Sequence, residues 1–238
     1  MKHKNTKAMI LLLLSCTLIV SVFFVSRKKP QNIAVNQTIA VTKHSSSDET
    51  ATEAATDKEE PSVEPASKKV VGGRTYIDGI LIVNKHYSLP SDYNPGVDQT
   101  ADAAIQKMIV AAHKDGITLW VRSGFRSYDI QTSLYNTYVA EDGKSAASRY
   151  SARPGHSEHQ TGLAFDLNSL DQSFGKTPEG KWIAKNCWKY GFIIRYPKAK
   201  EDVTGYMYEP WHVRYLGKEV AKKVTESGLC LEEYLRIG

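Results

Sequence analysis

The sequence predicts an α+β fold for residues 70–238. Apolar residues recur at helical spacing over 98–114, whereas over 117–121 they alternate with other residues as in a half-buried strand. Further predicted strands and helices follow without the regular strand–helix alternation that produces a parallel α/β sheet. This mixed order favours a sheet with helices packed around it over a doubly wound fold.

The first half of the domain contains a predicted strand and two predicted helices. Residues 79–83 form the strand. The amphipathic helix over 98–114 ends before Gly116, since glycine commonly follows the last turn of a helix. Ser127 precedes the second helix, 128–141, because a serine hydroxyl can accept a hydrogen bond from a first-turn amide.

The second half of the domain again mixes the two kinds of element. Residues 163–168 form a predicted strand, and the helix over 177–190 has a proline in its first turn and Gly191 after its last. Residues 192–196 and 211–216 are further strands. Two short helices complete the predicted domain.

The segment 1–29 is predicted to be a membrane anchor or a signal segment. Residues 8–25 are mostly apolar and lie between Lys and Arg residues, at the short end of what spans a bilayer. The absence of a small-x-small cleavage site before Arg27 favours an uncleaved anchor over a cleaved signal peptide. A lipoprotein signal ending at Cys16 is the third interpretation.

Residues 30–69 are predicted to be a disordered linker. Ser, Thr, Ala, Glu and Lys dominate this stretch, and it contains no Trp, Tyr or Phe. Such a composition cannot bury enough apolar surface to offset the entropy lost on folding. The linker suits a domain tethered to a membrane.

The net charge of +5 is distributed unevenly along the chain. Residues 1–29 carry six basic and no acidic residues, 30–69 carry four basic and seven acidic, and 70–238 carry 21 basic and 19 acidic. The three parts therefore contribute +6, −3 and +2. Because the basic excess belongs to the N-terminal segment, we expect no nucleic-acid partner.

Three cysteines occur, at positions 16, 187 and 230. None has the spacing of a metal-ligand pair. A disulfide between Cys187 and Cys230 is left open. Cys187 lies on an apolar helical stripe, and this position favours a buried, unpaired thiol.

Two short stretches, SEHQTGLAFD at 157–166 and EPWH at 209–212, carry the residues that predict a chemical function. A turn at Gly162 would allow the following strand to bring Asp166 back beside His159. Asp166 and a small residue then share one side of that strand, which leaves room for an ion. With His212 as a third ligand, the set of two imidazoles and a carboxylate fits zinc, although other transition metals remain open.

Glu209 is predicted to lie beside this metal site without being a ligand. The following Pro210 restricts Glu209 to extended geometry, which directs a carboxylate toward the metal as a general base. Arg126 follows a glycine at the end of a predicted strand, where its side chain can reach a cleft. It is the candidate cation that stabilises developing negative charge.

The pattern S-x-H-x-x-G-x-A-x-D, followed some forty residues later by E-x-W-H, resembles the signature of the VanY-like D-Ala-D-Ala carboxypeptidase family. The resemblance runs from about Tyr76 to Gly217 and includes SGFRS at 123–127, Gln131 and RYP at 195–197. It implies the hedgehog/D,D-peptidase-like fold, with a central, mainly antiparallel sheet and flanking helices.

The resemblance also implies an activity and a set of site residues. It implies one Zn2+ per chain on His159, Asp166 and His212, and it places Ser157 and Gln131 in contact with substrate. His156 lies outside the family pattern and is not expected to bind the metal.

The implied substrate is a peptidoglycan stem peptide that loses its C-terminal D-Ala, with D,D or L,D specificity left open. The chain is expected to be a monomer, membrane-associated through its N-terminal segment. Because the implied substrate lies outside the membrane, the catalytic domain is expected to be extracellular, on the cell-wall side. An endopeptidase and a non-catalytic cell-wall-binding module are the alternatives.

Overall fold

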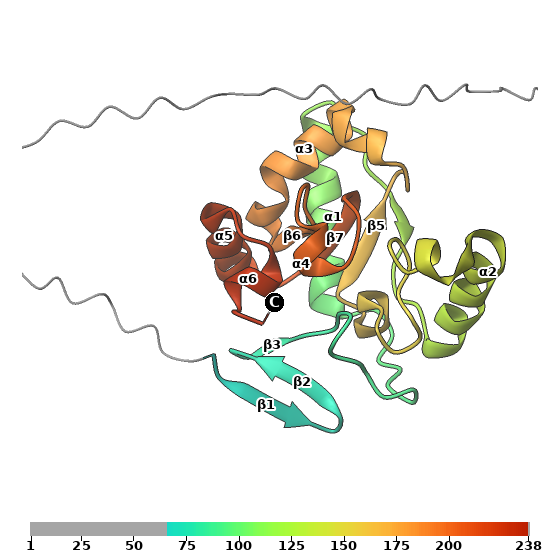
Figure 1. The fold of residues 1–238 in the computed structure, drawn as a ribbon. Helices are drawn as coiled ribbons and strands as arrows, with labels where there is room; N and C mark the ends of the chain where they lie inside the picture. The colour runs from blue at the N-terminus through green and yellow to red at the C-terminus, as the bar shows by residue number, and fades with distance from the viewer. Residues whose placement is uncertain (1–65, 238) are drawn as a thin grey trace, which may run out of the picture. The chain divides into compact units, whose positions relative to one another are not determined.

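A four-stranded antiparallel sheet lies at the centre of the computed structural model, which describes residues 66–237 (Figure 1). Its strand order is β4–β5–β7–β6, and the strands are β4 Val121–Ser123, β5 Ala164–Leu167, β7 Glu209–Tyr215 and β6 Phe192–Tyr196. Every pair of neighbours is antiparallel. The predicted α+β class and central antiparallel sheet are confirmed.

Helices surround this sheet (Figure 1). The α-helices are α1 Gln99–Lys114, α2 Tyr128–Ala147, α3 Pro178–Asn186, α4 Glu201–Thr204, α5 Lys218–Ser227 and α6 Leu231–Tyr234. Three 3₁₀ turns accompany them: η1 Glu158–Thr161, η2 Gln172–Lys176 and η3 Cys187–Tyr190. Asp98 caps α1 and the predicted Ser127 caps α2, each by accepting a hydrogen bond from a first-turn amide.

One face of the central sheet forms the main hydrophobic core. Phe165 and Leu167 of β5 and Trp211 and Val213 of β7 pack in one buried cluster with residues of α1 and α3. Because side chains alternate along a strand, the residues between them point to the opposite face. Polar side chains of β5, β6 and β7 therefore gather on that opposite face, where the candidate site lies.

A smaller antiparallel sheet, β1 Lys68–Val71, β2 Arg74–Ile77 and β3 Ile80–Leu81, precedes α1. Ile77 of β2 packs in a second buried cluster with Ile193 of β6 and with residues of α5 and α6. The sequence placed the start of the domain near Val70, but the hairpin already begins at Lys68. Only β3 had been predicted, because β1 is exposed and lacks a clear alternation of apolar residues.

Two predicted elements differ in extent from those observed. The strand expected at 117–121 is observed only from Val121, as β4. Before it, the Asn168 side chain, and not a neighbouring strand, forms hydrogen bonds with the backbone. Its Oδ1 accepts from Trp120 N at 3.0 Å, and its Nδ2 donates to Thr118 O at 2.8 Å. Helix α2 continues to Ala147, with a break at Gly143, where φ is 80°.

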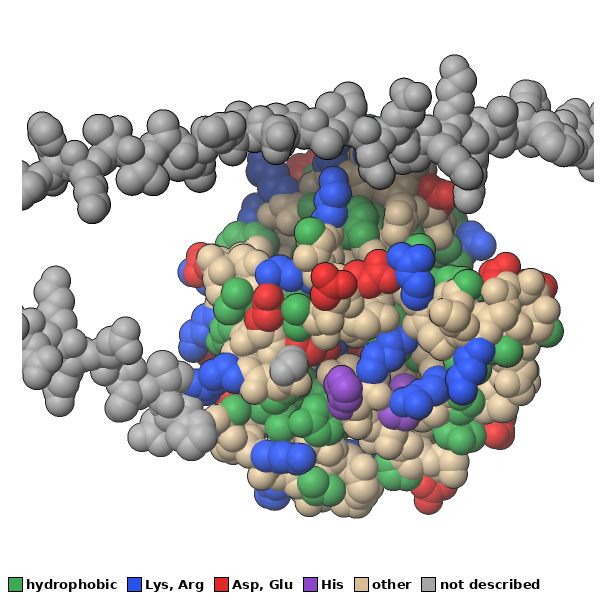
Figure 2. Space-filling model, viewed as in Figure 1, with side chains coloured by type: hydrophobic (Ala, Val, Ile, Leu, Met, Phe, Trp, Pro, Cys, Tyr) green, Lys and Arg blue, Asp and Glu red, His purple; other side chains and the backbone are tan. Residues whose placement is uncertain are grey.

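Both cysteines of the described part are free and buried, so Cys187 and Cys230 do not pair there. Within residues 66–237, no helix has the length and apolar character needed to cross a membrane. The predicted anchor or signal segment 1–29, its Cys16 and the linker up to residue 65 lie outside the described residues. On the face in Figure 2, basic and acidic side chains are interspersed, in keeping with a nearly neutral domain.

Candidate metal centre

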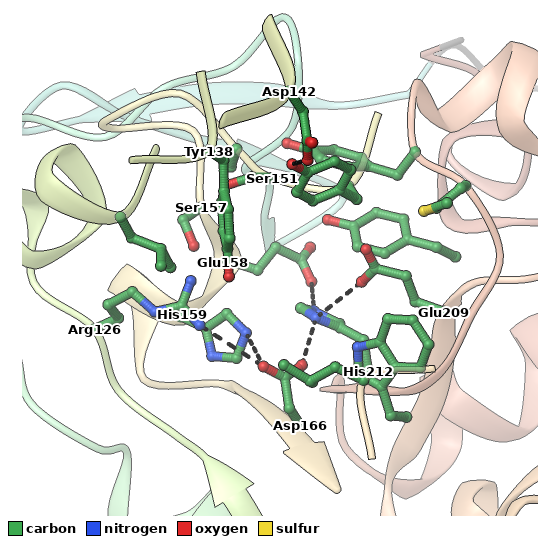
Figure 3. A pocket seen from close by; sticks show the side chains of 18 of the residues that line it. Arg126, Tyr138, Asp142, Ser151, Ser157, Glu158, His159, Asp166, Glu209 and His212 are labelled. Carbon is green, nitrogen blue, oxygen red and sulfur yellow. Dashed lines mark hydrogen bonds and ion pairs between the residues drawn. The ribbon is translucent and has the colours of Figure 1, made fainter. Parts of the chain in front are cut away.

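A pocket of about 360 Å³ opens on the polar face of the central sheet (Figure 3). Its lining includes all three predicted metal ligands together with Glu209, Arg126 and Ser157. Two aromatic residues, Tyr196 and Trp211, also line it. The structure therefore brings residues from four separate stretches of the chain to one cavity.

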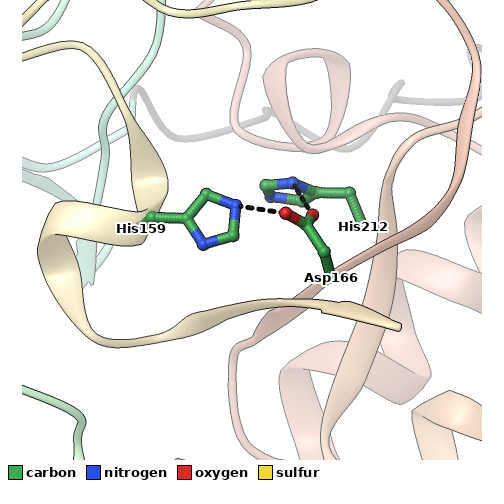
Figure 4. Close-up of side chains that lie close together, drawn as sticks. All are labelled: His159, Asp166 and His212. Atoms are coloured by element: carbon green, nitrogen blue, oxygen red, sulfur yellow. Dashed lines mark ion pairs between the residues drawn. The ribbon is translucent and has the colours of Figure 1, made fainter. Parts of the chain in front are cut away.

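The three predicted ligands, all of which line this pocket, converge on one another (Figure 4). His159 Nε2 lies 3.1 Å from Asp166 Oδ2, and His212 Nδ1 lies 3.1 Å from Asp166 Oδ1. One ligand atom from each residue lies within 4.8 Å of the others, and all three residues are buried. Such a group of two imidazoles and one carboxylate could hold a single metal ion.

The strand register and one glycine turn create this convergence. Asp166 of β5 pairs directly with His212 of β7 in the antiparallel ladder, so their side chains emerge side by side. Gly162 ends η1 with φ of 74° and turns the chain from His159 back into β5. A Cβ at this position would lie 2.1 Å from the Gly96 carbonyl oxygen, so the turn requires glycine.

The two histidines present different ring nitrogens to the ligand cluster. His159 Nδ1 lies 2.7 Å from the Gly124 carbonyl oxygen, which can only accept, so Nδ1 carries the proton and Nε2 is free. His212 has the opposite orientation. Its Nδ1 faces Asp166 and Glu209, and its Nε2 faces Glu158 at 3.6 Å.

The charge of the cluster fits a bound cation. Burial on its own would raise the pKa of Asp166, but the neighbouring His159 and His212 hold it well below its usual range. Burial lowers the pKa of His159, and this direction favours the unprotonated imidazole that a metal ligand must be. Among the described residues, buried Asp166 Oδ1 has no hydrogen-bond partner, so an acceptor is left over for an ion.

Glu209 lies beside the cluster, as predicted, with its side chain pointing into the pocket (Figure 3). Its Oε2 is 3.6 Å from His212 Nδ1, and the residue is 5% exposed. Burial raises the pKa of Glu209 to about 8. A carboxyl group in this environment can both take up and return a proton near neutral pH.

Arg126 also points into the pocket, with Nη2 3.7 Å from Asp166 Oδ2. Nη1 donates to Gln131 Oε1 at 2.7 Å and Nη2 to Ser123 Oγ at 3.1 Å, so the guanidinium is fixed in place. Gln131 itself is fully buried and donates to Ala152 O at 2.6 Å. We expected Gln131 to contact substrate, but it lies behind Arg126 and outside the pocket lining.

Several pocket residues were not predicted from the sequence. Tyr138 and Asp142 of α2 and Tyr150 beyond it line the pocket, and Tyr150 Oη donates to Asp142. The residues that α2 contributes to the pocket are spread along the helix, so they form no short sequence motif. His156 lies apart, with Nδ1 2.7 Å from Asn84 O, in agreement with its predicted exclusion from the metal site.

An antiparallel sheet that presents two histidines, an aspartate and an adjacent buried glutamate to one pocket defines a metallohydrolase class of domain. The chain belongs to the VanY family of D-alanyl-D-alanine carboxypeptidases, whose family model matches residues 94–218. The expected family is thereby confirmed.

Individual relatives agree with this assignment. The putative carboxypeptidase YodJ of Bacillus subtilis is 43% identical over a match of 180 residues. The match covers 65% of this chain and 66% of YodJ, just under two thirds of its length. The solved LdcB LD-carboxypeptidase is 49% identical to this chain, with a TM-score of 0.67. The match covers 72% of this chain and 95% of the LdcB chain.

A third relative was solved with a metal ion. It is a mutant of the D,D-pentapeptidase VanY from a VanB-type vancomycin resistance cassette, in complex with Zn(II). It is 36% identical to this chain with a TM-score of 0.59, and the match covers 65% of this chain and 97% of that one.

Proposed function

We propose that this chain is a zinc-dependent carboxypeptidase that removes C-terminal D-Ala from peptidoglycan stem peptides. The observation that carries the proposal is the convergence of His159, Asp166 and His212 beside the buried Glu209. Three protein ligands with an adjacent proton acceptor are typical of a catalytic rather than a structural zinc site. The carboxypeptidases among the relatives support the same conclusion.

Each site residue has a proposed role. One zinc ion per chain would be held by His159 Nε2, Asp166 and His212 Nδ1. Zinc in a three-ligand site supplies Lewis acidity, which acidifies water and polarises a carbonyl group. Glu209 takes the proton from the attacking water and delivers it to the leaving amine.

The polar residues at the pocket wall have supporting roles. Arg126 stabilises the negative charge that develops on the scissile carbonyl oxygen, a contribution of roughly 3–4 kcal/mol for a well-placed donor. We assign Gln131 to positioning Arg126, because its amide oxygen holds the guanidinium from behind. Ser157, which lines the pocket, would bind the peptide by hydrogen bonding.

We further propose that the preferred substrate is a tetrapeptide stem, cleaved between an L-centre and D-Ala. The support is similarity: identity is 49% to an LD-carboxypeptidase and 36% to a D,D-pentapeptidase. In the same proposal, the domain acts as a monomer on the outer side of the membrane. Segment 1–29 anchors it, and 30–65 serves as the tether.

The test is to incubate the purified full-length chain, in detergent, with synthetic tetrapeptide and pentapeptide stems and to measure the products by mass. Release of D-Ala, faster from the tetrapeptide, is the expected result. A chelator should abolish the release and added zinc should restore it. Faster release from the pentapeptide would reverse the specificity, whereas cleavage inside the peptide would indicate an endopeptidase. Peptide binding without any cleavage would indicate a binding module.

A further inference from the structure

A fully buried carboxylate, that of Glu158, lies directly behind the proposed ligand His212. Arg195 Nε and Arg214 Nη1 both donate to Glu158 Oε1, each at 2.7 Å. The other oxygen, Oε2, receives neither bond and instead faces His212 Nε2 at 3.6 Å. Within residues 66–237, neither Oε2 nor Nε2 has a hydrogen-bond partner, although both atoms are buried.

The charges around Glu158 balance without involving His212. Arg195 also binds Glu232 of α6 through two bonds, of 2.8 and 2.5 Å, so the cluster contains two carboxylates and two guanidinium groups. Glu158 Oε1 accepts a hydrogen bond from each of two guanidinium groups, Arg195 and Arg214, and such charge-assisted bonds favour the ionised carboxylate. The carboxylate is therefore ionised and can only accept hydrogen bonds.

The backbone fixes Glu158 as firmly as the charges do. It opens η1, the same turn that carries His159, and Thr161 Oγ1 donates to its carbonyl oxygen at 2.6 Å. Arg214 is also held in place, because its Nη2 donates to the Leu81 carbonyl oxygen at 2.7 Å. Glu158 Oε2 is consequently a fixed acceptor placed against one particular nitrogen of His212.

We propose that Glu158 is a positioning residue for His212: its Oε2 accepts the Nε2 proton, which leaves the Nδ1 lone pair directed at the metal. The inference rests on the proposed function, because it gives Nδ1 a zinc ion to bind. A small tilt of the imidazole closes the gap between Oε2 and Nε2 to a hydrogen bond of about 2.9 Å. Such partners of ligating histidines fix both the tautomer and the ring orientation.

The test compares Glu158→Gln with the matched variant Glu232→Gln, each as the full chain in detergent with zinc alone as the probe. In Glu158→Gln, the amide oxygen of the new side chain can still accept from the two arginines, but its NH2 group then meets the Nε2 proton. We expect zinc affinity, measured by competition with a chromogenic chelator, to fall about 10–100-fold. Glu232→Gln also weakens the cluster around Arg195 but does not contact His212. It should lower the melting temperature while zinc affinity stays within about threefold of wild type.

A second measurement uses the wild-type chain and does not depend on any variant folding. In the zinc-loaded, 15N-labelled protein, His212 should show a protonated, slowly exchanging Nε2 and a metal-shifted Nδ1. Its signals are assigned in the wild-type chain by through-space contacts with the ring of Tyr196, whose centroid lies 5.0 Å from that of His212. Zinc bound through Nε2 would overturn the inference, as would equal zinc affinity of wild type and Glu158→Gln, or an equal loss in both variants. A wild-type chain that binds no zinc would overturn the proposed function as well.

Discussion

Replacing Glu209 by glutamine separates the proposed chemistry from metal binding. The amide has nearly the same size and shape as the carboxyl group but cannot take up a proton from water. Glu209 is 5% exposed, and its Oε2 stands 3.6 Å from His212 Nδ1 without being one of the three converging ligand atoms. The variant should therefore lose the general-base contribution of about 10²–10⁴ in kcat, or roughly 3–5 kcal/mol of transition-state stabilisation.

The same substitution should leave the fold and the metal site intact. Burial raises the pKa of Glu209, which means that the ionised carboxylate is costly to bury and that a neutral amide replaces it without loss. We expect the zinc-free variant to melt no lower than wild type and to bind zinc with similar affinity. Glu219→Gln, at an exposed position in the first turn of α5, is the matched control.

The assay is the initial rate of D-Ala release at saturating peptide, with bound zinc quantified in the same sample. Near wild-type turnover by Glu209→Gln would refute the assignment of Glu209 as the base. Loss of zinc together with activity would instead make Glu209 part of the metal-binding set.

Three further predictions concern the turn, the pocket cation and the tether. Gly162→Ala should lower the free energy of unfolding by well over the roughly 1–2 kcal/mol that a left-handed backbone conformation costs alanine. The added Cβ would lie 2.1 Å from the Gly96 carbonyl oxygen. Gly116 has the same φ of 74° but no atom within 4 Å of an added Cβ. In thermal unfolding, Gly116→Ala should therefore show only the cost of the left-handed backbone. Arg126→Lys should reduce kcat/KM by about 10²-fold because lysine lacks the planar fork, whereas exposed Arg122→Lys should not. Protease added to intact cells should cut within residues 30–65 and release an active fragment; a chain already present in the medium, beginning just after residue 25, would contradict the anchor.

The metal ligands could be predicted because their arrangement is encoded locally. His159 and Asp166 share one short stretch with a glycine between them, and strand alternation places Asp166 on the polar side. His212 required only that its own strand pair with that of Asp166, as it does. The proline after Glu209 likewise indicated the extended geometry that β7 shows.

Residues that act through distant partners could not be predicted in this way. Gln131 was expected to contact substrate, but its environment depends on Arg126 and on Ala152, twenty-one residues away. Glu158 stands inside the motif, yet its partners Arg195 and Arg214 lie 37 and 56 residues further along the chain. A buried ion cluster of this kind has no periodicity or spacing, so only the three-dimensional structure reveals it.

The hydrogen bond between Asn84 and Glu232 bears on the order in which the domain folds. The bond joins residues 148 positions apart, from the loop after β3 to α6. Closing so long a loop costs chain entropy before any contact compensates for it, so contacts of this separation form late. We therefore expect the contact between Asn84 and Glu232 to complete the charge cluster near the end of folding, in the slowest kinetic phase.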